Sequence, residues 1–316
     1  MSSFLALVQL SLPLFVLVGV GYGLMRFAHW PAEVSMALSR FVFSLALPAM
    51  LFHLMSDLSR LPPVDWRVLV AFFGSCLLVF VIARIAAWKL FRLDGTAQSV
   101  FALGAVFSNN ALLGLPLARV TLGPEALPSV ALVLVFNALT LWTLLTVSVE
   151  WSRHGQLSAK GFARTARGVL TNPLVAAILV GTGFGLTGLR LPALLGQPLA
   201  MLSDAAVPLS LLSLGMSLAE HGVRAGWRIA VSITALKLLL QPLMVYALAR
   251  LLGLAPRETQ VVVMLGSIAV GANVYLMSRQ FKTLEGPVAS SLVLSTALSA
   301  FTTPLALHWV GAQAPP

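Results

Sequence analysis

Long apolar stretches recur from one end of this chain to the other, and they restrict its fold more than any other feature. A membrane-crossing helix needs about 20 mainly apolar residues. Only 9% of the 316 residues are charged, against roughly 25% in an average soluble domain. The apolar stretches are continuous rather than alternating, which disfavours a β-barrel. The sequence therefore predicts an all-α polytopic membrane protein with ten spans, at residues 4–25, 34–55, 67–90, 97–119, 127–149, 168–188, 193–218, 229–252, 259–280 and 287–309.

The net charge of +10 lies in short connections between these spans and does not gather on one soluble surface, so we expect no nucleic-acid partner. Lysine and arginine are enriched in cytoplasmic loops. Twelve of them fall on one side of the predicted spans and six on the other. We therefore expect a multi-pass protein of the inner (cytoplasmic) membrane, with both termini outside and the longest polar connection in the cytoplasm.

The two halves of the chain resemble each other weakly. Leu-Pro or Asn-Pro pairs recur 160 residues apart, and an asparagine in the fourth span recurs 164 residues later in the ninth. The matched residues are Pro13 with Pro173, Pro48 with Pro208, and Asn109 with Asn273.

These matches predict a first five-helix repeat at 1–150, a cytoplasmic linker at 151–167 and a second repeat at 168–316. Because five is odd, the second repeat enters the membrane from the opposite side. Inverted repeats are characteristic of secondary transporters.

The fourth span carries amides and helix breakers where a membrane helix is usually dry and straight. Pro116 removes an N–H group, and Gly114 allows the chain to bend. A break inside a membrane frees backbone groups and is tolerated only within protein or beside a water-filled cavity. Asn109 and Asn110 add amides that bind a carboxylate or a water. We predict a broken helix here, with these four residues in a substrate site.

The ninth span carries a weaker version of the same pattern, with Gly266, Gly271 and Asn273 but no proline. We predict that this span is also irregular, and that the two broken helices cross near the middle of the membrane. Asn109 and Asn273 would then lie on either side of one cavity. The alternative is that these asparagines only hold helices together, with about 0.6–2 kcal/mol each.

Lys237 lies well inside the eighth span. A lysine in a span is costly and usually functional, so we expect it to neutralise an anionic substrate or to bind carbonyls freed by a break. The alternative is that its side chain extends to the cytoplasmic interface. No aspartate or glutamate lies near the middle of any span, which argues against a buried carboxylate relay. We find no HExxH or GxSxG motif, and we predict that the protein is not an enzyme.

Several of these stretches resemble the auxin efflux carrier family of bacterial and plant transporters. The family pattern N-x-G-x-x-G-[IL]-P-L appears here as NNALLGLPL, from Asn109 to Leu117, with alanine at its first glycine. The stretches FVFSLALPAMLF, NPLVAAILVG, AAVPLSLLSLGMSL and GANVYLMSRQF are similar to the family's second, sixth, seventh and ninth spans. Family members often have a proline where Ala269 stands, so the second break is expected to be less sharp.

The resemblance implies two inverted five-helix repeats with crossing helices 4 and 9, scaffold helices 1, 2, 6 and 7, and a transport bundle of helices 3–5 and 8–10. It also implies a homodimer formed through the scaffold. Plant relatives export auxin, and bacterial relatives are associated with malonate or malate. This chain lacks the long cytoplasmic loop of the plant proteins and resembles the bacterial type.

We therefore expect a secondary transporter of small organic anions that works by elevator-type alternating access. Two alternatives stay open, namely an exporter of auxin-like aromatic carboxylates, and a facilitative channel or uniporter for another small solute. The sequence predicts no cofactor or metal. It leaves the substrate, the direction of transport and any coupling to protons or sodium undecided.

Overall fold

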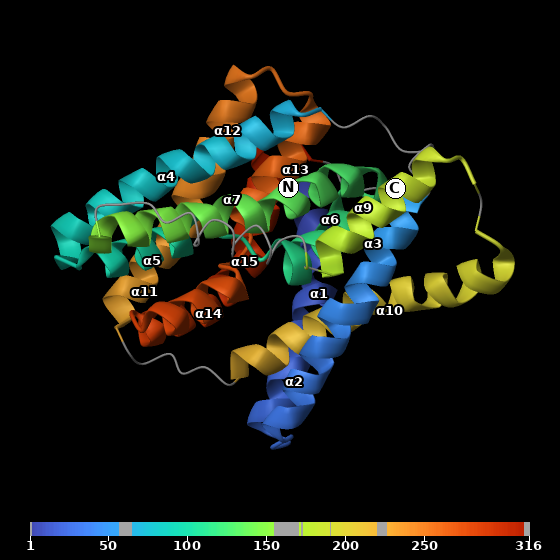
Figure 1. Cartoon of the computed structure of the whole chain (residues 1–316), viewed down its shortest axis with the longest axis horizontal. Coiled ribbons are helices and arrows are strands. Elements are labelled where there is room, and N and C mark those ends of the chain that lie inside the picture. Colours follow the sequence, from blue (N-terminus) through green and yellow to red (C-terminus); the bar gives the residue numbers. More distant parts are fainter. Residues whose placement is uncertain are drawn as a thin grey trace.

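A computed structural model describes residues 2–56, 65–154, 171, 173–189, 191–219 and 226–312, and it is almost entirely helical (Figure 1). Most of the predicted linker at 151–167 lies outside the described residues. The α-helices are α1 (Ser2–Arg26), α2 (Ala32–Phe41), α3 (Leu47–Ser56), α4 (Arg67–Phe91), α5 (Gly95–Val106), α6 (Leu115–Thr121), α7 (Leu127–His154), α9 (Pro173–Leu186), α10 (Ala193–Ala219), α11 (Trp227–Ala235), α12 (Gln241–Leu251), α13 (Pro256–Ser267), α14 (Ala272–Phe281) and α15 (Glu285–Trp309). Short π-helices are η1 (Val42–Ala46), η3 (Asn110–Gly114) and η5 (Leu236–Leu240), and η4 (Pro124–Ala126) is a 3₁₀ turn.

Six helical stretches among the described residues are long and apolar enough to cross a membrane. They are Phe4–Arg26, Ala32–Ser56, Arg67–Phe91, Ala193–Ala219, Trp227–Leu251 and Glu285–Trp309. Shorter apolar helices occupy Gly95–Val106, Pro124–Asn137 and Pro173–Leu186. The predicted class, a helical multi-pass membrane protein, is confirmed. In the predicted fourth and ninth spans, a helix stops partway and a second helix resumes after a short extended segment.

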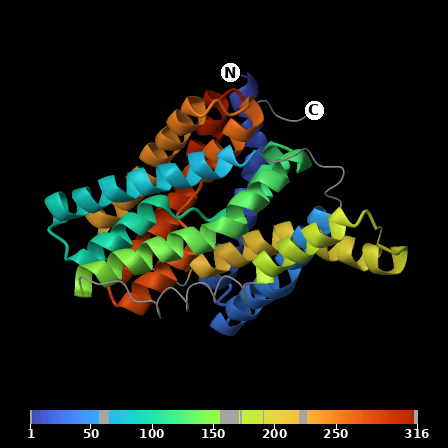
Figure 2. The same cartoon turned by 45° about the horizontal axis from the view of Figure 1, so that its top comes forward.

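The helices form two groups (Figures 1 and 2). In the first group, α1 packs along α10, and α3 packs along α9 and against α10. In the second group, α4 packs on α5 and α12, while α13 packs on α12 and α15. Figure 1 shows α2, α3, α9 and α10 on one side of the molecule and α4, α5, α11 and α14 on the other.

Close backbone contact in the first group depends on glycine. A Cβ atom at Gly215 of α10 would lie 1.9 Å from the carbonyl oxygen of Val18 on α1. A Cβ atom at Gly21 of α1 would lie 2.2 Å from the carbonyl oxygen of Leu212 on α10. Only residues without a side chain allow this approach, and small residues are the usual means by which membrane helices pack closely.

Three prolines follow π-helical turns rather than breaking their helices. Each π-helix ends two residues before a proline, at Pro48, Pro116 and Pro242. The residue before each proline donates its N–H to the carbonyl five residues earlier. Proline has no N–H and its ring clashes with the carbonyl four residues earlier, so a widened turn accommodates the ring without ending the helix.

The prediction that Gly114 and Pro116 break the fourth span is therefore wrong. Both residues lie in the continuous helical stretch of η3 and α6. Gly114 instead allows close packing against α13, because a Cβ atom there would lie 3.0 Å from side-chain atoms of Leu265 and of Ile268. The actual break is earlier, at the three residues between α5 and η3.

Candidate functional site

The site is built on two breaks that bind each other. The extended segment between α5 and η3 runs antiparallel to the one between α13 and α14, and Ser108 and Val270 form an isolated β-bridge. The Asn109 N–H donates to the Ala269 carbonyl at 3.0 Å, and the Gly271 N–H donates to the Phe107 carbonyl at 2.8 Å. Each break thereby satisfies backbone groups that the other has freed, which is what a membrane interior requires.

The ninth span is interrupted as fully as the fourth, although Ala269 replaces the proline expected from the resemblance. The Val270 N–H donates to Ser295 Oγ of α15 at 3.0 Å. The Ser267 carbonyl, at the end of α13, accepts from Thr303 Oγ1 at 3.0 Å. Side chains of α15 therefore satisfy backbone groups at this break, and no proline is needed to produce it.

The structure corrects the alignment of the two halves at this point. Ser108 pairs with Val270, and the helices resume at Asn110 and Ala272, so the equivalent positions are 162 residues apart. Asn109 immediately precedes its helix, whereas Asn273 is the second residue of α14. Matching asparagine with asparagine at a separation of 164 was therefore wrong by two residues, because backbone pairing and not residue type sets the register.

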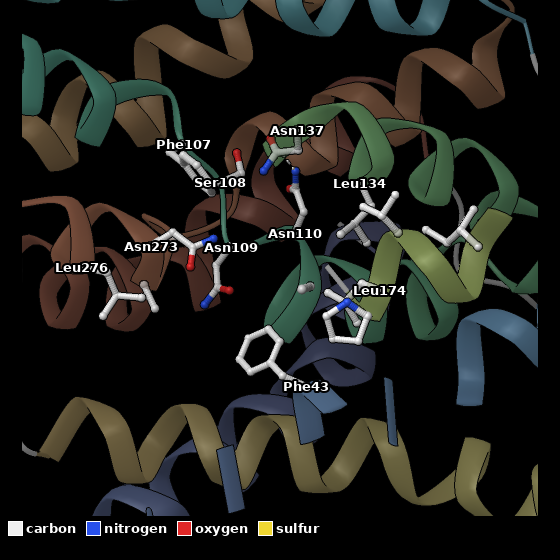
Figure 3. A pocket seen from close by; sticks show the side chains of 16 residues that line it. Phe43, Phe107, Ser108, Asn109, Asn110, Leu134, Asn137, Leu174, Asn273 and Leu276 are labelled. Carbon is white, nitrogen blue, oxygen red and sulfur yellow. Dashed lines mark hydrogen bonds between the residues drawn. The ribbon is translucent and has the colours of Figure 1, made fainter. Parts of the chain in front are cut away.

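A cavity of about 310 Å³ lies beside the crossing (Figure 3). Its polar lining consists of Ser108, Asn109, Asn110, Asn137 and Asn273. Its largest apolar side chains are Phe43, Phe107, Leu134, Leu174, Ile178 and Leu276. The pocket thus has contributions from η1, α7, α9 and both broken segments, and Figure 3 shows the amides near the crossing with Phe43 and Leu174 on the opposite wall.

Several polar atoms at the crossing are buried without a partner. Asn110 Nδ2 donates to Asn137 Oδ1 over a long 3.4 Å. Ser108 Oγ, Asn109 Nδ2 and Asn110 Oδ1 have no hydrogen-bond partner among the described residues. A buried polar group without a partner costs about 1–3 kcal/mol, so these atoms are suited to binding a polar group within the pocket.

Two helix N-termini also meet at the pocket. The helical stretch of η3 and α6 begins at Asn110, and α14 begins at Ala272. The first N–H groups of a helix have no carbonyl of their own helix to bind, and they carry partial positive charge. No lysine or arginine lines the pocket. The attraction for an anion at this site therefore comes from amides and helix ends.

The predicted site residues divide into two sets. Asn109, Asn110, Gly271 and Asn273 line the pocket together. Gly271 must be small, because a Cβ atom there would lie 2.8 Å from the Phe107 ring. The second set, Gly114, Pro116 and Lys237, does not line the pocket.

Lys237 has a different position from either sequence-based expectation. Its side chain is 0% exposed, so it does not extend to the membrane interface. Its Nζ donates to the carbonyl of Gly266 in the last turn of α13. Nearby, Gln241 Nε2 lies 3.2 Å from Ser75 Oγ and 3.3 Å from Cys76 Sγ. Lys237 thus stabilises the end of a broken helix, as one of the two expected roles required.

Sequence reasoning missed Asn137, Ser108 and Phe43. Asn137 is an isolated amide in the apolar stretch of α7, and that feature could have identified it. Ser108 adjoins the two asparagines, but serine is common in membrane helices. Nothing in the sequence distinguishes Phe43 from the other apolar residues of its span. Among the described residues, no group of three or more His, Cys, Asp or Glu side chains could hold a metal ion.

Crossed broken helices around an amide-lined pocket define a helical membrane protein with a solute site inside the bilayer. A family model described as "Membrane transport protein" matches residues 6–307. The chain therefore belongs to this transporter family, which includes the auxin efflux carriers, and its relatives are transporters rather than enzymes.

Individual relatives agree with this assignment over nearly their whole length. A "Putative malonate transporter" of Rhizobium meliloti is 26% identical over 312 residues, which is 97% of each chain. An "Uncharacterized transporter" of Methanothermobacter thermautotrophicus is 27% identical over 96% of this chain and 98% of its own. "Auxin efflux carrier component 8" of Arabidopsis thaliana is 20% identical over 96% of each chain.

Proposed function

We propose that this protein is a secondary transporter that moves small organic anions across the cytoplasmic membrane, with its substrate site in the pocket at the crossing. The observation that carries this proposal is the meeting of two helix N-termini with four asparagines and a serine in one partly buried cavity. Helix N-termini and neutral amides bind a carboxylate without a fixed opposite charge that would hold it too tightly to release.

The packing of the helices supports ten spans in two inverted repeats, at 1–150 and 168–316. Exchanging the two halves converts the contact of α1 with α10 into that of α9 with α3. It likewise converts α4 with α5 into α12 with α13, and α5 with α7 into α13 with α15. The pairing of Ser108 with Val270 lies on the same approximate two-fold axis. Both termini outside and a cytoplasmic connection at 151–167 complete this proposed topology.

The location of the pocket supports an elevator-type mechanism. Phe43, Leu174 and Ile178 come from the first helix group, which corresponds to scaffold helices 1, 2, 6 and 7. The crossing and Asn137 come from the second group, which corresponds to the transport bundle. A movement of the second group along the first would carry the crossing, with its bound anion, past a largely apolar wall. A homodimer through the scaffold remains our prediction for the assembly.

The chemistry of the pocket also favours a second candidate substrate. Its polar atoms are concentrated at the crossing, whereas the opposite wall is apolar. A dicarboxylate such as malonate, which the name of the Rhizobium relative suggests, would place its second charge against that wall. A single carboxylate with an apolar body, as the name of the plant relative suggests, fits both ends of the pocket.

Uptake into proteoliposomes tests the proposal and separates the candidates. Radiolabelled malonate, malate and indole-3-acetate would be offered in turn, with membrane potential, proton gradient and sodium gradient imposed separately. We expect saturable uptake of at least one acid and its loss in Asn109→Ala. Absence of saturable uptake for all three, with the protein folded and inserted, would refute the anion proposal. Single-channel currents would instead support a channel.

A further inference from the structure

Lys237 is the one lysine or arginine of the described chain whose side chain is fully buried. It lies near the middle of the 25-residue helical stretch Trp227–Leu251. Ion pairs among the described residues join Arg67 to Asp65, Arg119 to Asp204, and Arg257 to Glu125, and none of them includes Lys237. Its charge is therefore not cancelled by a neighbouring carboxylate.

The partner of Lys237 is a helix end rather than an acid. Its Nζ donates to the Gly266 carbonyl, in the last turn of α13. A helix C-terminus carries partial negative charge, and the broken helices of transporters commonly direct such ends at a cation. The ammonium group thus occupies the kind of place that a bound cation takes at a broken helix, and it is covalently attached to the protein.

The helix that carries Lys237 belongs to the second group. The stretch formed by α11, η5 and α12 makes its main contacts with α4, α5, α13 and α15, all of the same group. The chain from Gly266 leads through the break to Gly271 and Asn273, which line the pocket. The positive charge and the pocket are therefore parts of one body.

We propose that Lys237 is a moving countercharge, whose positive charge crosses part of the membrane field together with the substrate. This inference rests on the proposed elevator mechanism. With a monoanion bound, the moving body carries a charge near zero, and membrane potential has little effect on its crossing. Without substrate, the body carries the lysine charge, and its return is the step that responds to potential.

The magnitude of the effect follows from the charge that moves. One elementary charge crossing the whole field changes the ratio of two conformations by about 50-fold per 100 mV. A charge that crosses only part of the field gives a correspondingly smaller change. Net transport still moves only the charge of the substrate in each cycle, because Lys237 returns to its starting position.

Displacement currents of the protein without substrate test this proposal. Voltage steps would be applied to patch-clamped giant vesicles that contain the full-length protein and no organic anion. We expect the wild type to give transient currents whose integrated charge saturates at both voltage extremes. Lys237→Met should lose at least half of that charge, whereas Lys237→Arg should retain it. Arg250→Gln is the matched control, because Arg250 is exposed at the end of the same helix, and it should leave the displaced charge unchanged.

Two results would overturn the proposal. One is a wild type that transports an acid but shows no displacement current. The other is an unchanged displaced charge in Lys237→Met, which would mean that the lysine only stabilises the end of α13. A failure of the transport proposal itself has a different signature, because then no acid would be taken up by any variant. If Lys237→Met does not fold, the wild-type recording alone still decides whether a charge moves.

Discussion

The crossing of the two broken helices predicts a sharp steric effect at Gly271. In Gly271→Ala, the new Cβ atom would lie 2.8 Å from Cδ1 of Phe107 and 3.1 Å from the carbonyl oxygen of Ser108. Phe107 is buried, with 2% exposure, and the Ser108 carbonyl is part of the paired backbone. Inserting one methyl group into a well-packed site typically costs about 1–3 kcal/mol. We therefore expect Gly271→Ala to reduce both the stability of the protein and its transport activity.

The assay compares thermal unfolding and proteoliposome uptake with a control glycine. Gly183 lies in α9, and a Cβ atom there would meet nothing within 4 Å. Because alanine favours a helix over glycine by about 0.5–1 kcal/mol, Gly183→Ala should be neutral or slightly stabilising. A second substitution, Phe107→Leu, should restore part of the stability lost in Gly271→Ala, since it removes ring atoms from the contact.

The steric argument would fail on either of two results. One is a Gly271→Ala variant as stable and as active as the wild type. The other is strict additivity of Gly271→Ala and Phe107→Leu, because residues in contact show coupling in a double-mutant cycle.

Three further predictions concern the lining of the pocket. Asn109→Ala should raise the KM for the transported acid by about 10- to 140-fold, the equivalent of one hydrogen bond to a charged group at about 1.5–3 kcal/mol, and Asn109→Asp should be more damaging because it repels an anion; equal KM values in uptake assays would contradict this. Asn137→Leu should raise KM as well, because it removes the hydrogen-bond partner of the buried Asn110 amide, whereas an unchanged KM would show that α7 does not take part in binding. Phe43→Ala should weaken uptake of indole-3-acetate more than that of malonate, since only the larger acid reaches the apolar wall; an equal loss for both would argue against that wall as a determinant of specificity.

Much of the architecture could be predicted because the bilayer imposes it. A span must be apolar over about 20 residues, so composition alone located the helical stretches. The fourth and ninth spans were identified as irregular from amides and glycines that a straight span does not need. Asn109 and Asn273 were correctly expected to line one cavity, and the structure places both there.

The details that were wrong depend on contacts between distant segments. Pro116 suggested a break, but a π-helical turn absorbs its ring, and the break lies where Ser108 can pair with Val270. The register of the two halves followed that pairing and not the identity of the asparagines. Phe43 joins the pocket only because the two helix groups meet there, which no local pattern reveals.

The central claim is that the crossing binds the carboxylate of the transported acid, and a structure with that acid bound tests it most directly. We predict that the carboxylate lies within hydrogen-bonding distance of Ser108 or Asn109 and faces the N-terminus of α14, with the rest of the molecule toward Phe43 and Leu174. A carboxylate bound elsewhere, for example against Lys237 on α13 or outside the cavity beside the crossing, would contradict the account.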